Sequence, residues 1–252
     1  MTIPDVSRER GTAMRELPLG KGDYVAGGAW SMPFLDLDGA RRRRPLIFGE
    51  VMLDKTGYPE LAESMFSGRC ANPGDWAVMW KELGADGICL RVTEGDWPAV
   101  LSISERTRLP LAISGPYEAV REVSEAVDDS AMILIPDDGD ISAEGHYSVG
   151  IDIAVMEPTV PGPDFVRALT IGRTMRSEAI LSESPGKPAL CDVTGVWNLD
   201  SDGDEYMRMR RMSMLEAQSA LAAMLAGADI IIVRGPGAAD MARVYGEELA
   251  DL

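Results

Sequence analysis

The sequence predicts an α/β fold of the TIM-type (β/α) barrel class, built as a single domain over residues 1–252. Strand-like and helix-like segments alternate to the end of the chain. The strand-like segments are short, continuous apolar runs, which is typical of parallel strands buried on both faces. The same Gly-Ala-Asp turn joins a helix to a strand at 84–86 and at 227–229. A doubly wound open sheet is the alternative, but no G-x-G-x-x-G segment follows any strand.

Seven parallel strands are predicted, and a closed barrel of this class has eight. The strands are 45–52, 86–92, 110–114, 131–136, 151–156, 188–193 and 229–234. The helices are 74–83, 98–108, 117–127, 163–182, 204–226 and one from 238. The barrel is therefore expected to be shortened by about one βα unit, between 136 and 150. An irregular N-terminal arm of about 1–40 contains the stretch YVAGGA at 24–29, which could replace the missing strand.

The charge and cysteine content exclude several classes of function. The chain has 24 basic and 41 acidic residues, a net charge of −17. Nucleic acid and anionic membrane surfaces require the opposite charge, so neither is an expected partner. There is no signal-like N-terminus and no apolar run near the roughly 18 residues of a membrane span, which favours the cytoplasm.

The cysteines and the single histidine argue against a metal centre held by this chain alone. Three widely spaced cysteines without a C-x-x-C motif cannot form a zinc ribbon or a four-cysteine iron–sulfur site. Cys89 and Cys191 lie in apolar stretches and are predicted to be buried thiols. The single histidine, His146, lies in an acidic loop and is predicted to be a surface residue.

Polar residues follow the predicted strands, where the functional loops of barrels lie. They could do acid–base work or bind a ligand, or they could cap the following helices in solvent, which is the more common situation. These residues are Glu50, Asp54, Arg91, Thr93, Ser114, Asp137, Asp138, Glu157, Thr159, Asp192, Thr194 and Arg234.

Four further segments have a predicted role. DSDGDE at 200–205 resembles a calcium loop, but its glycine is in the wrong register, so a helix cap is expected. Met207, Met214, Leu221 and Leu225 share one helical face, which predicts a core face. RGPGA at 234–238 resembles the phosphate cradle of some barrels. The arginines at 41–44 precede the first strand, and a structural role in tethering the arm to acidic helices is favoured over anion binding.

Two regions of the chain resemble a known family. The stretches GGAWSMPFLDLDG (27–39), RRPLIFGEVMLD (43–54) and NPGDWAVMWKELGADGICLRV (72–92) are similar to the small (delta) subunit of the corrinoid iron–sulfur protein of the acetyl-CoA decarbonylase/synthase system. LAGADIIIVRGPGA (225–238) is similar to the last helix–strand unit of that family. The resemblance covers about 26–93 and, less closely, about 187–245.

The resemblance implies a TIM barrel that covers a corrinoid together with a large subunit, which carries the iron–sulfur cluster. Methyl groups would pass from methyl-tetrahydropterin to the cobalt of that cofactor. In this chain the cofactor-binding residues would be Arg91, Thr93, Ser114, Asp192 and Thr194, with no catalytic residue and no metal ligand.

Departures from the family pattern leave two alternatives. Glu157-Pro158 replaces the usual Asp-Pro, and Gly235-Pro236 replaces a His-Pro pair. One alternative is a pterin-dependent methyltransferase that uses methyltetrahydrofolate, with Asp137, Glu157 and Asp192 as pterin ligands. The other is a non-catalytic assembly subunit that kept the fold.

Overall fold

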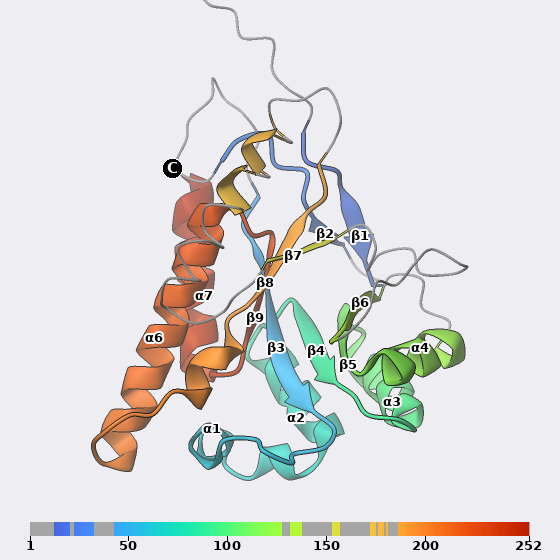
Figure 1. Ribbon diagram of the computed structural model, residues 1–252, viewed down its shortest axis with the longest axis vertical. Coiled ribbons are helices and arrows are strands. Elements are labelled where there is room, and N and C mark those ends of the chain that lie inside the picture. The colour runs from blue at the N-terminus through green and yellow to red at the C-terminus, as the bar shows by residue number, and fades with distance from the viewer. Residues whose placement is uncertain are drawn as a thin grey trace, which may run out of the picture.

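One parallel sheet of seven strands, with helices packed along its outer side, forms the body of the molecule (Figure 1). This computed structural model describes residues 13–20, 23–32, 43–127, 132–137, 153–156, 172–174, 176–178, 180 and 186–251. The seven predicted strands are confirmed, with bounds that differ by at most a few residues. They are β3 (Leu46–Met52), β4 (Gly87–Arg91), β5 (Leu111–Gly115), β6 (Ile133–Pro136), β7 (Ala154–Met156), β8 (Ala189–Asp192) and β9 (Ile230–Val233).

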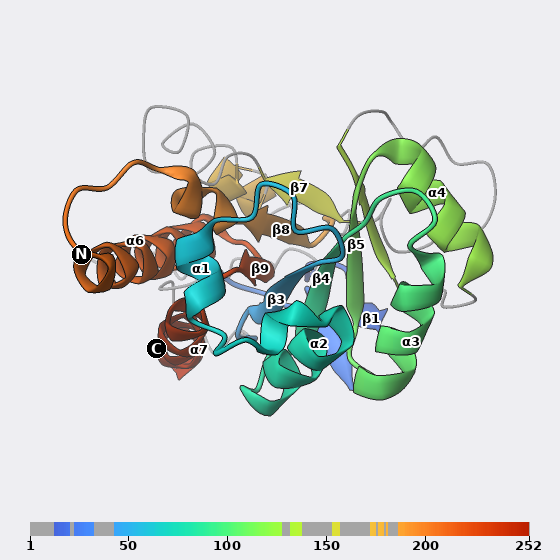
Figure 2. The ribbon, with the colours of Figure 1, turned by 90° about the horizontal axis from the view of Figure 1, so that it is seen from below.

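The strand order shows a TIM-type barrel. The order is β6-β5-β4-β3-β9-β8-β7, so the first sheet strand pairs with the last, with Leu46 opposite Ile230 and Gly49 opposite Val233. This pairing curls the sheet back on itself, as Figure 2 shows from below. The two ends of the order are β6 and β7. Most of the chain that joins them, 138–152, lies outside the described residues. The joining segment is too short to contain another full βα unit. The fold is a shortened (β/α) barrel.

The helices follow the strands as predicted, with three short additions. The additions are α1, η1 and η3, which the sequence pattern did not indicate. The helices are α1 (Glu60–Ser64), α2 (Pro73–Glu82), α3 (Trp97–Thr107), α4 (Tyr117–Ala126), α6 (Glu205–Ala226) and α7 (Pro236–Asp251), with the 3₁₀ helices η1 (Arg69–Ala71) and η3 (Thr194–Asn198). The described residues within 172–180 are also helical, inside the predicted helix 163–182.

The repeated Gly-Ala-Asp turn has the same construction at both places. Gly84 and Gly227 have φ of 79° and 100°, a left-handed conformation that favours glycine and ends α2 and α6. Asp86 then accepts a hydrogen bond from the backbone N–H of Ile47 in β3 at 2.8 Å. Asp229 likewise accepts from the N–H of Ala189 in β8 at 2.9 Å. Each aspartate thus fixes the start of a neighbouring strand.

The arginine run acts at this amino-terminal end of the barrel. Arg44 binds both carboxylate oxygens of Asp86, at 2.7 and 2.6 Å. Arg43 binds Glu16 of the N-terminal arm at 2.8 Å. The structural role is therefore correct for these two residues, although the tether of Arg43 goes to the arm itself and not to a helix. Arg41 and Arg42 lie outside the described residues.

Alternate residues of each strand face the two sides of the sheet, and both sides are apolar. Ile47, Val51, Ile88 and Leu90 pack toward the helices, while Phe48, Cys89, Leu190 and Ile232 belong to a second cluster inside the barrel. This arrangement explains why the strands read as continuous apolar runs.

A short antiparallel hairpin of β1 (Leu17–Leu19) and β2 (Tyr24–Ala26) closes the interior cluster at its amino-terminal end (Figure 1). The prediction of an irregular arm missed this hairpin. Within the described residues β2 pairs only with β1, so the YVAGGA stretch does not supply an eighth barrel strand.

The predicted core face of α6 is wrong at Met207 and Met214, which are each 48% exposed, while Leu221 and Leu225 are half-buried. The helix turns Met212, Glu216, Ala220 and Ala223 toward the body, where it packs on β9 and α7. Asp204 caps the helix by accepting from the N–H of Met207 at 2.8 Å, as expected for the DSDGDE segment. In the described part of the chain, no group of His, Cys, Asp and Glu is placed to hold a metal ion.

The three cysteines are buried and unpaired. Burial raises the pKa of the Cys89 thiol to about 12 and that of Cys191 to about 12, so neither is poised as a thiolate. No described helix is both long enough and apolar enough to cross a membrane.

Gly49 is expected to be irreplaceable at the contact between β3 and α2. A Cβ atom on Gly49 would lie 2.1 Å from Cδ2 of the buried Trp80. Gly49→Ala should therefore lower the free energy of unfolding by about 1–3 kcal/mol or more. Gly237→Ala is the control, because a Cβ there meets no atom within 4 Å and Ala is the better helix former. Equal stability of the two variants in urea denaturation would contradict this packing.

Candidate functional site

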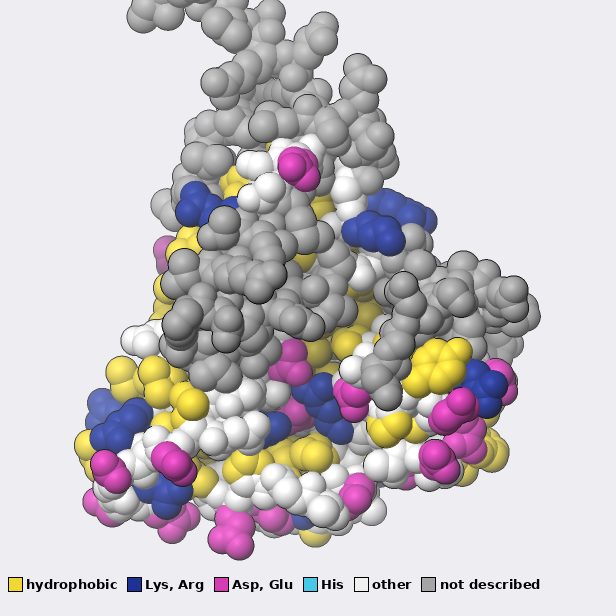
Figure 3. Space-filling view, in the orientation of Figure 1, with side chains coloured by type: hydrophobic (Ala, Val, Ile, Leu, Met, Phe, Trp, Pro, Cys, Tyr) yellow, Lys and Arg dark blue, Asp and Glu magenta, His cyan; other side chains and the backbone are white. Residues whose placement is uncertain are grey.

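A cavity of about 410 Å³ opens at the carboxyl ends of the strands, and we call it the mouth cavity. Basic and acidic side chains meet there, near the centre of the lower half of the space-filling view (Figure 3). Side chains from β3, β4, β5, β9 and the loops that follow them form its wall. Its polar lining includes Glu50, Arg91, Ser114, Asp137, Thr194 and Arg234.

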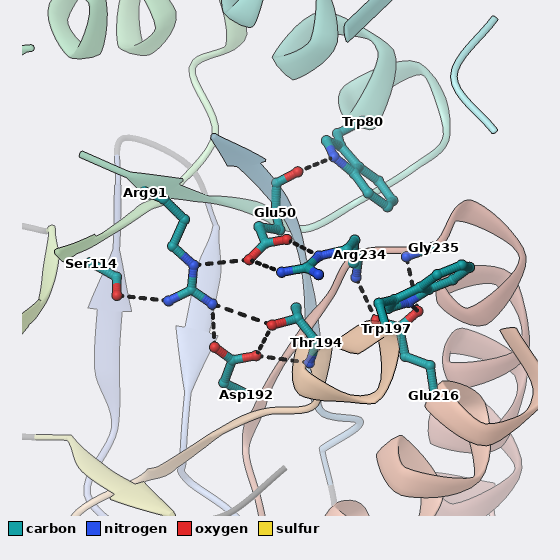
Figure 4. Close-up of polar contacts among 10 residues, drawn as sticks. All are labelled: Glu50, Trp80, Arg91, Ser114, Asp192, Thr194, Trp197, Glu216, Arg234 and Gly235. Carbon is teal, nitrogen blue, oxygen red and sulfur yellow. Dashed lines mark hydrogen bonds and ion pairs between the residues drawn. The ribbon is translucent and has the colours of Figure 1, made fainter. Parts of the chain in front are cut away.

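Glu50 is the central residue of the mouth. It is only 1% exposed, and its two oxygens accept from two arginines that come from the strands on either side of β3. Arg91 Nε donates to Oε1 at 2.9 Å, while Arg234 Nε donates to Oε2 at 2.5 Å and its Nη2 reaches Oε1 at 3.3 Å (Figure 4). Charge-assisted hydrogen bonds of this kind compensate a carboxylate that has lost its water.

Arg91 connects Glu50 to two more strands. Its Nη1 donates to Ser114 Oγ at 2.7 Å, and its Nη2 donates to Asp192 and lies 3.5 Å from Thr194 Oγ1. The other oxygen of Asp192 accepts from the N–H and the hydroxyl of Thr194, at 2.9 and 2.7 Å. One guanidinium therefore holds the ends of β3, β5 and β8 together (Figure 4).

The charges of Asp192 and Arg91 remain in place at neutral pH. Burial alone would raise the pKa of Asp192, but the positive charge of Arg91 and the hydrogen bonds from Arg91 and Thr194 outweigh it and lower that pKa. Burial also opposes the charge of Arg91, yet the negative groups around it, Asp192 and Glu50 among them, raise its pKa. Neither group is placed to exchange a proton near neutral pH.

Arg234 is held by two contacts besides Glu50, and the second of them is to Glu216, which binds two further donors. Its guanidinium lies over the ring of Tyr58, 5.0 Å from the centroid. Its backbone N–H donates to Glu216 Oε1 at 2.6 Å, and the N–H of Gly235 donates to Glu216 Oε2 at 2.9 Å. Trp197 Nε1 also donates to Oε2, at 2.8 Å. The carboxyl group of the fully buried Glu216 thus occupies two backbone donors of the predicted phosphate cradle.

The structure brings together most of the predicted cofactor-binding residues. Arg91, Ser114 and Thr194 line the mouth cavity, and Asp192 joins them through Arg91. Thr93 also lines the cavity, but its hydroxyl donates to Asp96 at 2.9 Å and takes no part in the network. Whether these five residues bind a cofactor stays a prediction.

Other strand-end residues behave differently. Asp54 accepts from the N–H and hydroxyl of Thr56, the local capping role expected of such residues. Asp138, Glu157, Thr159 and His146 lie outside the described residues, so the predicted surface position of His146 and the pterin role of Glu157 cannot be placed on this fold.

The sequence pattern missed Tyr58, Trp197 and Glu216. The available signal was that Glu216 lies four residues from both Met212 and Ala220, on the side of α6 that proves to be buried. A buried carboxyl group requires hydrogen-bond partners inside the protein. A glutamate on a buried helix face therefore indicates that N–H donors from another segment pack against it.

No protein-family model matches the sequence, and no curated protein is similar enough to count as a relative. Solved structures of dihydropteroate synthases are similar in fold. One dihydropteroate synthetase with a bound product has 14% identity and a TM-score of 0.50, over 94% of this chain and 100% of that chain. The enzyme from Xanthomonas albilineans with 7,8-dihydropteroate has 16% identity and a TM-score of 0.49, over 85% and 95% of the two chains. The enzyme from Thermus thermophilus has 16% identity and a TM-score of 0.46, over 93% and 98%. The likeness to the first of these structures supports the barrel fold.

Glu216 should give the folded protein a measurable pH dependence. Burial raises the pKa of Glu216 to about 8, against the lowering effect of its three N–H donors and of Arg234. A pKa above the ordinary value of 4.5 means that the folded state holds a proton that the unfolded state releases. The contribution of Glu216 to the free energy of unfolding should therefore be largest below about pH 4.5, and it should be lost as the pH rises through 8.

The Glu216→Gln variant has no such proton to release. The slope of its free energy of unfolding against pH, measured by urea unfolding between about pH 5 and 9, should therefore be less steep than that of the wild type by the equivalent of up to one proton. Glu105→Gln, at an exposed position of α3, is the matched control and should keep the wild-type slope. Identical slopes in the Glu216→Gln variant and the wild type would contradict the assignment.

Proposed function

We propose that the chain binds a polar organic cofactor of one-carbon methyl transfer in the mouth cavity, and that it acts as a binding subunit without acid–base catalysis of its own. The observation that carries this proposal is the pairing of both deep carboxylates with arginines. Glu50 is held by Arg91 and Arg234, and Asp192 is held by Arg91 and Thr194. A ligand therefore meets hydrogen-bonding groups that are already fixed in position.

The same pairing argues against a general acid or base among these residues. Such a group works best when its pKa lies near the working pH and when its proton can reach the substrate. The pKa of Asp192 is lowered by Arg91 against the effect of burial, and both oxygens of Glu50 already accept from guanidinium groups. The mouth is suited to orienting a ligand, while the hard chemistry belongs to the cofactor.

A pterin such as methyltetrahydrofolate fits the mouth in size and polarity. A volume of about 410 Å³ lies within the range of about 300–1,000 Å³ that is usual for small-molecule sites. The edge of a pterin ring carries both donors and acceptors. Arg91 and Ser114 offer donors to it, and Asp137 offers a carboxylate acceptor. The fold shared with a dihydropteroate synthetase agrees with this choice.

A corrinoid held together with a partner chain is the second candidate. The resemblance over residues 26–93 favours it, and so does the composition of the wall. Side chains of Arg, Ser and Thr suit the neutral amide groups that surround a corrin ring. A corrin ring is larger than the mouth cavity, so this barrel would cover only one face of it. The corrinoid protein, with its iron–sulfur large subunit, would supply the rest.

Isothermal titration of the purified chain separates these candidates. Saturable 1:1 binding of methyltetrahydrofolate supports the pterin site, and binding of cobalamin without methyltetrahydrofolate supports the corrinoid site. Absence of heat with both, for a chain shown to be folded by its melting transition, overturns the proposal and leaves the non-catalytic assembly subunit.

Substitution of the mouth hydroxyls should weaken binding in a graded way. A single neutral hydrogen bond contributes about 0.5–1.5 kcal/mol, so Ser114→Ala and Thr194→Val should each raise the dissociation constant about 2- to 10-fold. Ser124→Ala is the matched control, because that hydroxyl binds the carbonyl of Arg121 on α4. A variant that folds normally and abolishes methyl transfer outright would show that the chain contains a catalytic residue of its own.

A further inference from the structure

The loops after the last two barrel strands have the position in which barrels of this class often bind phosphate. β8 is followed by η3, and β9 is followed by α7. Phosphate sites of barrels lie at the loops after the last two strands, beside the start of a helix, where backbone N–H groups and the helix dipole favour negative charge. Thr194, Asn198 and Arg234 of these loops line the mouth cavity. The phosphate position of this barrel is therefore next to the mouth.

Three N–H donors of these two loops converge on one carboxyl group. The backbone N–H of Arg234 donates to Oε1 of Glu216 at 2.6 Å (Figure 4). The backbone N–H of Gly235 and the indole N–H of Trp197 both donate to Oε2, at 2.9 and 2.8 Å. Glu216 reaches them from α6 and is 0% exposed. The donors that could hold a phosphate are thus used by a side chain of the same protein.

The backbone of the turn leaves space for this carboxyl group and for no second anion. A Cβ atom on Gly235 would lie 2.8 Å from Oε2 of Glu216 and 2.9 Å from Cζ2 of Trp197, so a side chain at this position would displace the carboxyl group. Pro236, the first residue of α7, has no N–H to donate. In the described stretch 234–236, every backbone N–H is therefore already taken.

We infer that Glu216 is a specificity-determining residue of the mouth, because it fills the phosphate position of the barrel and thereby excludes ligands that carry a phosphate or diphosphate group there. The inference rests on the mouth being a ligand site, as proposed above. It narrows the ligand class to compounds that are not phosphorylated at the end that lies near Arg234. A phosphate could enter only by displacing Glu216 from three hydrogen bonds, and the net charge of −17 would oppose its approach.

Removal of the carboxyl group should open the phosphate position. The Glu216→Ala change deletes the Cγ methylene and the carboxyl group, which together have the shape of an acetate ion. It leaves three buried N–H donors without an acceptor, which destabilises the folded chain. Added acetate or inorganic phosphate should bind these donors and restore stability. Such an anion raises the ratio of folded to unfolded chain about 11-fold at ten times its dissociation constant.

Urea unfolding in three salts tests the inference. The wild-type, Glu216→Ala and Met212→Ala chains would be unfolded at neutral pH in sodium acetate, sodium phosphate and sodium chloride of matched ionic strength. Met212→Ala is the matched control, because Met212 lies one turn earlier on the same buried face of α6 and its truncation frees none of the three donors. We expect acetate and phosphate to stabilise only the Glu216→Ala chain beyond the effect of chloride, along a saturable curve.

The wild-type chain provides a second measurement, which does not require the variant to fold. In a titration with inorganic phosphate, the backbone N–H resonances of Arg234 and Gly235 in the ¹⁵N-labelled chain should not move. A saturable shift of these resonances would overturn the inference. So would a Glu216→Ala chain that gains no more from acetate and phosphate than from chloride. These measurements use neither methyltetrahydrofolate nor cobalamin, so their failure is distinguishable from a failure of the proposed cofactor site.

Discussion

The geometry of the mouth depends on one buried carboxylate held between two arginines. Glu50 lies near the carboxyl end of β3, the strand that pairs with both β4 and β9, and an arginine from the end of each of these neighbours binds it. Removal of one member of such a buried group leaves an uncompensated charge, at a cost of about 3–5 kcal/mol. The backbone is fixed as well, because Trp80 Nε1 donates to the carbonyl of Glu50 at 2.8 Å. The central strand of the barrel is thus locked where a ligand would arrive.

The two ends of the barrel use the same chemistry for different purposes. At the amino-terminal end, Asp86 and Asp229 bind Arg44 and Arg176 and also accept from an N–H at the start of a neighbouring strand, so these pairs fasten strands together. At the carboxyl end, the arginines face a cavity. This difference explains why an acidic chain carries an arginine run before its first barrel strand. The described residues of that run, Arg43 and Arg44, form ion pairs at the amino-terminal end of the barrel, away from the cavity.

The sequence predicted the strands well, because runs such as 229–234 are apolar on both sides and leave little choice of structure. It also predicted that Arg91, Ser114 and Thr194 would lie together, since the carboxyl ends of parallel strands meet at one edge. It could not predict which partner each side chain takes. Arg91 binds residues from β3, β5 and β8. Which residues it binds depends on the length and direction of its side chain in the folded barrel, and spacing along the sequence does not show this.

Other features were hidden for physical reasons. The core face of α6 is formed largely by alanines, which hydrophobic patterns weight less than methionines, so Met207 and Met214 were placed inside when they lie outside. The hairpin at 17–26 is too short for a strand pattern and is stabilised by the barrel interior that it covers. Glu216 acts through backbone donors of a turn 18 and 19 residues away, at Arg234 and Gly235.

Nuclear magnetic resonance of the arginine side chains would test the central claim most directly. The wild-type chain, labelled with ¹⁵N, would be titrated with methyltetrahydrofolate and, separately, with cobalamin. We expect the Nε–H resonances of Arg91 and Arg234 to shift saturably with one of the two, while Arg44, at the other end of the barrel, does not move. Unchanged Arg91 and Arg234 resonances at saturating concentrations of both cofactors would contradict a cofactor site in the mouth, and so would an equal shift at Arg44.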